Sequence, residues 1–254
     1  MVSRVSEQQG RLREAIDSLY SVFAGYPLRS DTGACPCCHE PRDEPRLHAR
    51  PLRDLSAGDL QSYGHSALLT WGTAEDFKHF LPRLFEILAD TSDLEWVDAP
   101  IIFAKLRHAD WRDWPDSERR PVECYIATLW QWLLTDADCH RSAEGLLCAI
   151  AHAVDDLAPF LTGWRDSGMV GLRKLAGFAT DAAATIARRD HLPHAFWSDS
   201  VDQMRQVIDW LLEPATRHTL EEAFFADPSQ EMSTAVDWLD WLARFRKARS
   251  QTEE

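Results

Sequence analysis

Apolar residues recur at three- and four-residue spacing along almost the whole chain, which is the pattern of one buried face on an α-helix. No segment alternates apolar and polar residues as a half-buried β-strand does. Glycine is scarce, with 11 copies among 254 residues, and this suits helices better than β-rich folds. The sequence therefore predicts an all-α protein of about ten helices with almost no sheet.

Short connections between these helices predict antiparallel pairs that pack side by side. A HEAT-like or armadillo-like stack would repeat such pairs about every 40 residues, but no clear repeated motif is visible, and a globular bundle is the alternative. We expect one helical domain over residues 1–254. Within it we expect an irregular loop over 27–53, a helical hairpin over 54–90 and further helix pairs over 98–249.

Capping signals predict where the two helices of the hairpin begin. Ser56 is a candidate N-cap, and Thr73 with Asp76 has the spacing of a capping box. We expect the first helix of the hairpin to run to Trp71. Pro82 lies inside the second helix and is expected to bend it, because proline removes one backbone hydrogen bond.

The same reasoning applies to the later helices. An Ala-rich helix is expected over 169–189. Ser200 and Thr219 each precede an amide or acid by three residues, so both are candidate caps of further helices. Ser229 precedes the last apolar stripe and is expected to start the final helix.

The formal net charge is −14, and the excess of acidic residues is spread along the chain, with its largest share over 191–254. Clustered lysine and arginine are what phosphate contact requires, so we expect no nucleic-acid partner. An acidic surface can steer a basic protein instead. No stretch of 18 apolar residues and no apolar leader are present, so we expect a cytoplasmic protein with no membrane segment.

Three of the six cysteines lie within four residues, inside the proline-rich segment that has no other visible source of order. Cys35 and Cys38 form a C-x-x-C pair, a spacing that lets one loop present two thiolates to a metal ion. Cys37, His39 and His48 are the candidates for the third and fourth ligands. We therefore predict a zinc site, in which metal binding would help to order the loop.

Other interpretations of this cluster stay open. A redox C-x-x-C pair would be expected within a thioredoxin-like βαβ unit, which the sequence lacks. Alternatively, the three cysteines are free loop thiols, or they belong to a metal site that is completed only in an oligomer. If zinc binds, we favour a structural role, because no general-base motif lies beside the cluster.

Two further groups are candidate functional residues. Asp76, His79 and Arg83 lie at helical spacing and are a candidate polar surface site, although a solvated helix face explains them as well. Trp111 and Trp114 are a candidate interaction surface, since tryptophan is enriched at binding hot spots. Ordinary packing between helices is the alternative for these two indoles.

The three remaining cysteines are expected to be core thiols, because small buried thiols are common in helical cores. They are Cys124, Cys139 and Cys148. Cys148 and His152 also form an i, i+4 pair that could bind a metal from one helix face, but their apolar surroundings favour packing.

The N-terminal third carries three motifs in order: CPCC at 35–38, TWG at 70–72 and DFKHFLPRL at 76–84. This combination resembles a family of uncharacterised bacterial all-α proteins, and the resemblance covers residues 10–90. It implies a bacterial cytoplasmic protein. It also implies that the cysteine cluster, the TWG turn and the His79 helix belong to one structural unit.

No Gly-rich phosphate loop, G-x-S-x-G or H-E-x-x-H motif is present. We therefore expect a non-enzymatic helical scaffold or binding protein with a structural zinc loop. Its acidity suggests a basic protein partner, as when an immunity protein neutralises a toxin. The alternative is a zinc-dependent enzyme that uses Cys35, Cys38 and His48 and keeps one coordination position open.

Overall fold

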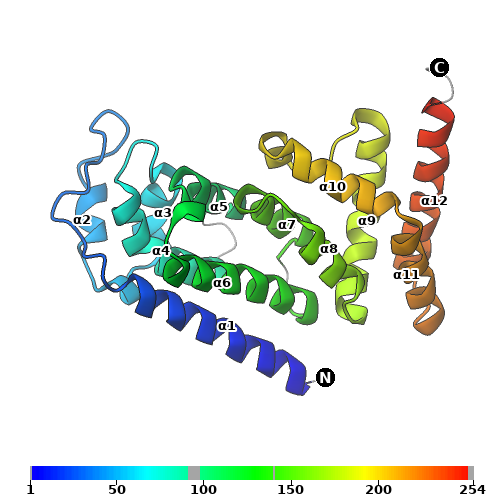
Figure 1. The fold of residues 1–254 in the computed structure, drawn as a ribbon, viewed down its shortest axis with the longest axis horizontal. Coiled ribbons are helices and arrows are strands. Elements are labelled where there is room, and N and C mark those ends of the chain that lie inside the picture. Colours follow the sequence, from blue (N-terminus) through cyan, green and yellow to red (C-terminus); the bar gives the residue numbers. More distant parts are fainter. Residues whose placement is uncertain (1, 91–97, 140, 251–254) are drawn as a thin grey trace. The chain divides into compact units, whose positions relative to one another are not determined.

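The computed structural model describes residues 2–90, 98–139 and 141–250. These ranges form twelve α-helices and three short 3-10 helices, and they contain no β-strand; one isolated bridge joins Ala67 and Trp71. The predicted all-α fold is therefore confirmed (Figure 1). Among the described residues, no helix combines the length and the apolar character needed to cross a membrane.

The chain divides into two compact units, Met1–Trp132 and Leu133–Glu254. The single helical domain expected over residues 1–254 stays a prediction, and so does the choice between a repeated stack and a globular bundle. The first unit holds α1 to α5 and most of α6, drawn in blue to green in Figure 1. The bounds are α1 Val2–Phe23, α2 Asp43–Leu47, α3 Ala57–Ser66, α4 Ala74–Ala89, α5 Ala99–His108 and α6 Asp116–Thr135, with 3-10 turns at Leu52–Asp54 and Trp111–Asp113.

The core of the first unit follows from the apolar stripes of α1 and α4, which pack against each other. The side chains in these stripes are almost fully removed from water, and burying each one contributes about 1.5–3 kcal/mol. They are Leu12, Ile16, Leu19 and Phe23 on α1, and Phe77, Phe80, Leu84 and Phe85 on α4.

Both predicted caps of the hairpin are confirmed as capping boxes. The Ser56 side chain accepts a hydrogen bond from the Asp59 backbone, and the Thr73 side chain accepts one from the Asp76 backbone. Helix α3 ends at Ser66, however, and not at Trp71 as expected. The chain turns here because Leu68 adopts a left-handed conformation with φ 65° and donates its N–H to the Trp71 carbonyl at 2.9 Å.

The second unit contains α7 Ala143–Ala153, α8 Ala158–Arg165, α9 Met169–Arg189, α10 Val201–Leu212, α11 Pro214–Ala226 and α12 Gln230–Ser250, with a 3-10 turn at Ala195–Asp199. Helices α9 and α12 pack along each other. Trp164 is fully buried and stacks between Phe178 and Trp210, with ring centres 5.4 and 5.9 Å away. These aromatic contacts form the centre of the unit's core.

The predicted caps of the second unit were correct in one case of three. Ser229 accepts a hydrogen bond from the backbone at the start of α12, as expected. Ser200 precedes α10, but its hydroxyl donates to the Ala151 carbonyl and makes no cap. Thr219 lies inside α11, because that helix begins five residues earlier at Pro214, whose fixed φ suits a first helical position.

Candidate metal centre

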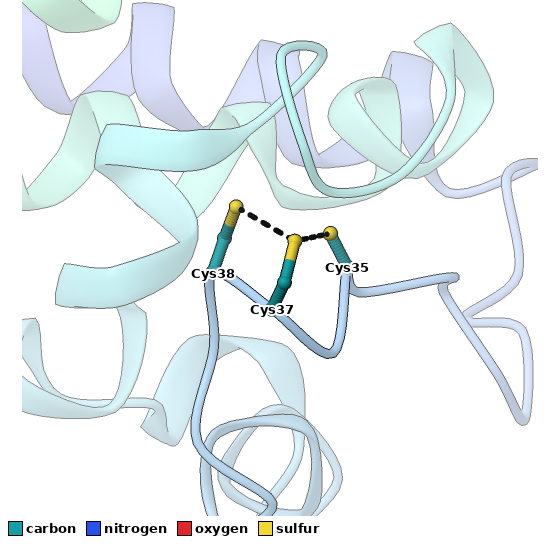
Figure 2. A group of neighbouring side chains, drawn as sticks. All are labelled: Cys35, Cys37 and Cys38. Carbon is teal, nitrogen blue, oxygen red and sulfur yellow. Dashed lines mark hydrogen bonds between the residues drawn. The ribbon is translucent and has the colours of Figure 1, made fainter.

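The three clustered cysteines lie in the loop between α1 and α2, and their sulfur atoms are in contact (Figure 2). The Sγ atom of Cys37 lies between the other two, 2.7 Å from Cys35 Sγ and 3.6 Å from Cys38 Sγ. All three sulfur atoms lie within 4.8 Å of one another. Cys35 is half-buried, and the other two thiols are exposed. This group has the composition and spacing to hold one metal ion.

A tight backbone turn holds the thiols on one side of the loop. The backbone N–H groups of Cys38 and His39 both donate to the Cys35 carbonyl, at 3.0 and 3.1 Å. Pro36 occupies the second position of this turn, where its fixed φ stiffens the backbone. The Cys35 N–H donates to the Thr70 carbonyl at 2.9 Å and so ties the turn to the segment that follows α3.

The contacts between the thiols separate their pKa values. Hydrogen bonding to Cys35 and to Cys38 raises the pKa of Cys37 to about 11. The hydrogen bond from Cys37 lowers the pKa of Cys35, because it stabilises the thiolate. Of these two thiols, Cys35 therefore ionises first. Since the thiolate is the form that ligates metals, a metal that engages all three sulfurs must displace the Cys37 proton.

The two candidate histidine ligands lie close to the cluster in sequence but have other partners. His39 Nε2 lies 3.1 Å from Thr70 Oγ1, and its ring lies 4.6 Å from the Trp71 ring. His48 Nε2 lies 3.5 Å from Glu44 Oε1. In the described ranges, the group of ligand atoms within 4.8 Å of one another contains the three cysteines and neither histidine.

The segment 27–53 is not irregular throughout, so that prediction was wrong in part. It contains α2 and the start of the 3-10 turn Leu52–Asp54, and Leu47 is fully buried. The indole N–H of Trp71 donates to Thr32 Oγ1 at 2.6 Å and to Glu44 Oε2 at 3.1 Å. Thr32 also donates to Glu44 through its backbone N–H and its hydroxyl. Hydrogen bonds from protein side chains therefore contribute to the order of this segment.

Asp76 does not belong to a polar surface site, because it is only 2% exposed. Its carboxylate pairs with the Arg29 guanidinium through both oxygens and accepts hydrogen bonds from the backbone and hydroxyl of Thr73. Burial opposes ionisation, but the hydrogen bonds from Arg29 and Thr73 outweigh it and lower the pKa of Asp76. The residue anchors the start of the loop to the first turn of α4.

His79 and Arg83 also act as anchors, each to a different segment. His79 Nδ1 lies 2.7 Å from the Tyr26 carbonyl. Arg83 donates to the Leu55 carbonyl at 2.7 Å and to Glu86 at 2.6 Å. The predicted surface site of Asp76, His79 and Arg83 is therefore wrong, because Asp76 is buried. The three side chains are bonded to other parts of the chain, Asp76 to Arg29, His79 to Tyr26 and Arg83 to Leu55.

Trp111 and Trp114 are core residues and not an exposed interaction surface, since they are 3% and 7% exposed. The Trp114 indole donates to the Ala109 carbonyl at 2.9 Å. Its ring lies 4.4 Å from the ammonium nitrogen of Lys78, which also pairs with Glu118 at 2.6 Å. No local pattern indicates this part-buried ion pair, because its two members are 40 residues apart in the sequence.

The remaining cysteines have mixed environments. Cys139 and Cys148 are buried as expected, and burial raises the pKa of both thiols. Cys124 is exposed on α6, so its assignment to the core was wrong. Val122 and Tyr125 are buried and belong to the apolar stripe of α6. Cys124 lies between them in the sequence, but helical geometry places it on the opposite side of the helix.

The CPCC and TWG motifs form one structural unit, because the Cys35 N–H reaches Thr70 and the His39 ring lies over Trp71. The proposed resemblance of residues 10–90 to a bacterial family stays a prediction. Comparison with protein-family models, with curated proteins and with solved structures finds no match to this chain.

Proposed function

We propose that this chain is a cytoplasmic, non-enzymatic helical binding protein whose cysteine loop holds one zinc ion. The observation that carries the proposal is the contact among three sulfur atoms on one exposed turn. Thiolates are ligands that zinc prefers, and three of them leave one position of its tetrahedron to be filled.

His39 is the best candidate for the fourth ligand, because it directly follows Cys38 in the same turn. To reach the metal, its ring must leave Thr70 and so lose one hydrogen bond, which costs about 1 kcal/mol. Zinc binding at structural sites contributes about 10–16 kcal/mol, which is far more than this loss. A site closed by His39 has no free position for substrate, and this favours a structural role.

The zinc ion in this proposal stabilises the CPCC turn, while hydrogen bonds between side chains hold the rest of the segment. Trp71, Thr32 and Glu44 already fix the segment from the inside. Metal removal is therefore expected to change the conformation and reactivity of the CPCC turn and to leave the helices in place.

The metal proposal is tested by metal analysis of protein purified under reducing conditions. We expect about one zinc per chain, and Cys38→Ser is expected to abolish binding. His39→Ala should weaken zinc binding by more than the roughly 10–100-fold cost of losing an outer-shell partner. Cys124→Ser is the matched control, since it removes an exposed thiol outside the loop. Zinc-free wild type, or a Cys38→Ser variant that keeps its zinc, would contradict the proposal.

The partner in this proposal is a basic protein, as in the immunity type of interaction. The net charge of −14 supports this. A groove between α9 and α12, lined by Trp238 and Trp241 with Asp237 and Arg188, is the candidate docking surface. Trp241 is exposed and Trp238 is half-buried, and tryptophan is enriched at binding hot spots. A pull-down from expressing cells should recover a basic protein that elutes as salt is raised, because charge steering is screened. Recovery of no salt-sensitive partner would count against this part of the proposal.

The zinc-enzyme alternative receives less support. It requires His48 as a ligand, and His48 lies beside Glu44 on α2. It would gain support if chelation removed a catalytic activity while the fold and the CPCC turn were unchanged.

A further inference from the structure

We propose that Cys35, Cys37 and Cys38 also form a binding site for trivalent arsenic, supplied as the neutral hydroxide that arsenite becomes in neutral water. The inference rests on the same cluster as the proposed zinc site, but it does not depend on His39. The ligand class is the trivalent metalloids, which form three bonds and so match the three thiols of the loop.

The first argument is the number of ligands. The cluster offers three sulfur atoms, and in the described residues no His, Asp or Glu ligand atom joins them within 4.8 Å. Trivalent arsenic forms three bonds, and its lone pair occupies the fourth direction. A zinc ion must recruit His39 or water to complete its shell, whereas arsenic needs only the three thiols.

The second argument is preorganisation. The Cys37 sulfur already contacts the sulfurs of Cys35 and Cys38, so the three thiols are close enough to bond to one central atom (Figure 2). The turn is held by two hydrogen bonds to the Cys35 carbonyl and by the bond to Thr70. A site that is fixed before binding avoids part of the entropic cost of association.

The third argument is the charge balance of the reaction. Three thiols react with one arsenic trihydroxide, three As–O bonds break and three As–S bonds form. Each thiol proton leaves with a hydroxide as water, so three waters are released. Arsenic stays trivalent and no oxidant or reductant is needed. The product is neutral, whereas three thiolates on zinc leave a negative charge, so an exposed loop can hold it without a counter-ion.

The test is intact-protein mass spectrometry after incubation of the reduced full-length chain with sodium arsenite. We expect the chain to gain one arsenic atom and to lose three hydrogens. A thiol reagent applied to the folded protein should then find Cys124 reactive and the three loop thiols blocked, since Cys139 and Cys148 are buried. A wild-type adduct in which arsenic keeps one hydroxide, so that the chain has gained AsOH and lost only two thiol hydrogens, would overturn the three-thiol assignment.

Variants make the test specific to the trio. Cys37→Ser removes the central sulfur and is expected to weaken arsenite binding by about a hundredfold, because the third bond forms at the high effective concentration of a short tether. Cys124→Ser should bind as the wild type does. Circular dichroism confirms that each variant is folded, which is expected because both side chains are exposed. Wild-type affinity in a folded Cys37→Ser variant would contradict the proposal.

A competition experiment separates this inference from the zinc proposal. Release of bound zinc by arsenite, with the three-hydrogen mass change, supports both. Zinc binding that arsenite does not disturb, with no arsenic adduct, overturns the arsenic site alone. A three-thiol arsenic adduct on a chain that binds no zinc overturns the zinc site alone.

Discussion

Replacing Trp71 with alanine is expected to lower the free energy of unfolding by about 4 kcal/mol, the usual cost of deleting a buried indole. Trp71 is 2% exposed, and its ring packs against Tyr63 with ring centres 5.5 Å apart. Its loss also removes the donor to Thr32 and Glu44, and it leaves the Glu44 carboxylate short of a partner in a partly buried position. Denaturant unfolding measures the change.

Two further variants separate the contributions of this residue. Trp71→Phe keeps an aromatic ring but removes the indole N–H, so it should cost about 1–3 kcal/mol. Trp241→Ala is the control for removing an indole, because Trp241 is 39% exposed, and its cost should stay below about 1 kcal/mol. If Trp71→Ala were as stable as Trp241→Ala, the indole would not be what holds the loop.

The same variant tests the link between Trp71 and the cysteine loop. His39 packs against the Trp71 ring. The Cys35 N–H donates a hydrogen bond to the carbonyl of Thr70, the residue before Trp71. In a Trp71→Ala chain that remains folded, the loop thiols should therefore react faster with an alkylating reagent than in the wild type. An unchanged rate would show that the CPCC turn is held by its own backbone bonds.

Local signals in the sequence were sufficient for most of the helices. The helix expected over 169–189 coincides with α9, and Ser56 and Thr73 cap α3 and α4. These predictions succeeded because helical periodicity and capping depend on residues within one or two turns of each other. Thr219 failed because a stronger local signal, Pro214, starts the same helix earlier.

The candidate site was predicted less completely, since its geometry depends on distant partners. The spacing indicated Cys35 and Cys38 as the metal pair, but Cys37 supplies the central sulfur of the trio. Asp76 was expected at the surface, and its burial follows from Arg29, which lies 47 residues away in the sequence. The spacing of residues along one helix does not show which loop will cover that helix in the folded protein.

Lys105 is a buried charge that no local pattern indicated. It lies on α5, is 2% exposed, and its ammonium group donates to the His65 carbonyl at 2.7 Å. Burial lowers the pKa of Lys105 from its usual 10.5 to about 8. The protonated side chain therefore destabilises the folded state, and a difference of this size in pKa corresponds to about 3 kcal/mol.

Lys105→Met is therefore expected to raise the free energy of unfolding by about 2 kcal/mol below pH 8, after about 1 kcal/mol is deducted for the lost hydrogen bond to His65. In the wild type, between pH 8 and 10.5 the unfolded chain holds a proton on Lys105 that the folded chain has released. Wild-type stability should thus gain a rising component across that window, and the methionine variant should lack it.

Denaturant unfolding on both sides of the Lys105 pKa tests this expectation. Lys174→Met is the matched control, because Lys174 also donates to a backbone carbonyl, that of Cys139 at 2.7 Å, but from a half-buried position. The control should lose about 1 kcal/mol through its hydrogen bond. A Lys105→Met variant that is less stable than the wild type below pH 8 would show that the bond to His65 outweighs the cost of burying the charge. Lys105→Met is thus expected to stabilise the protein and Lys174→Met to destabilise it, although both remove a hydrogen bond to a backbone carbonyl. The difference between the two changes in stability therefore measures the cost of burying the Lys105 charge.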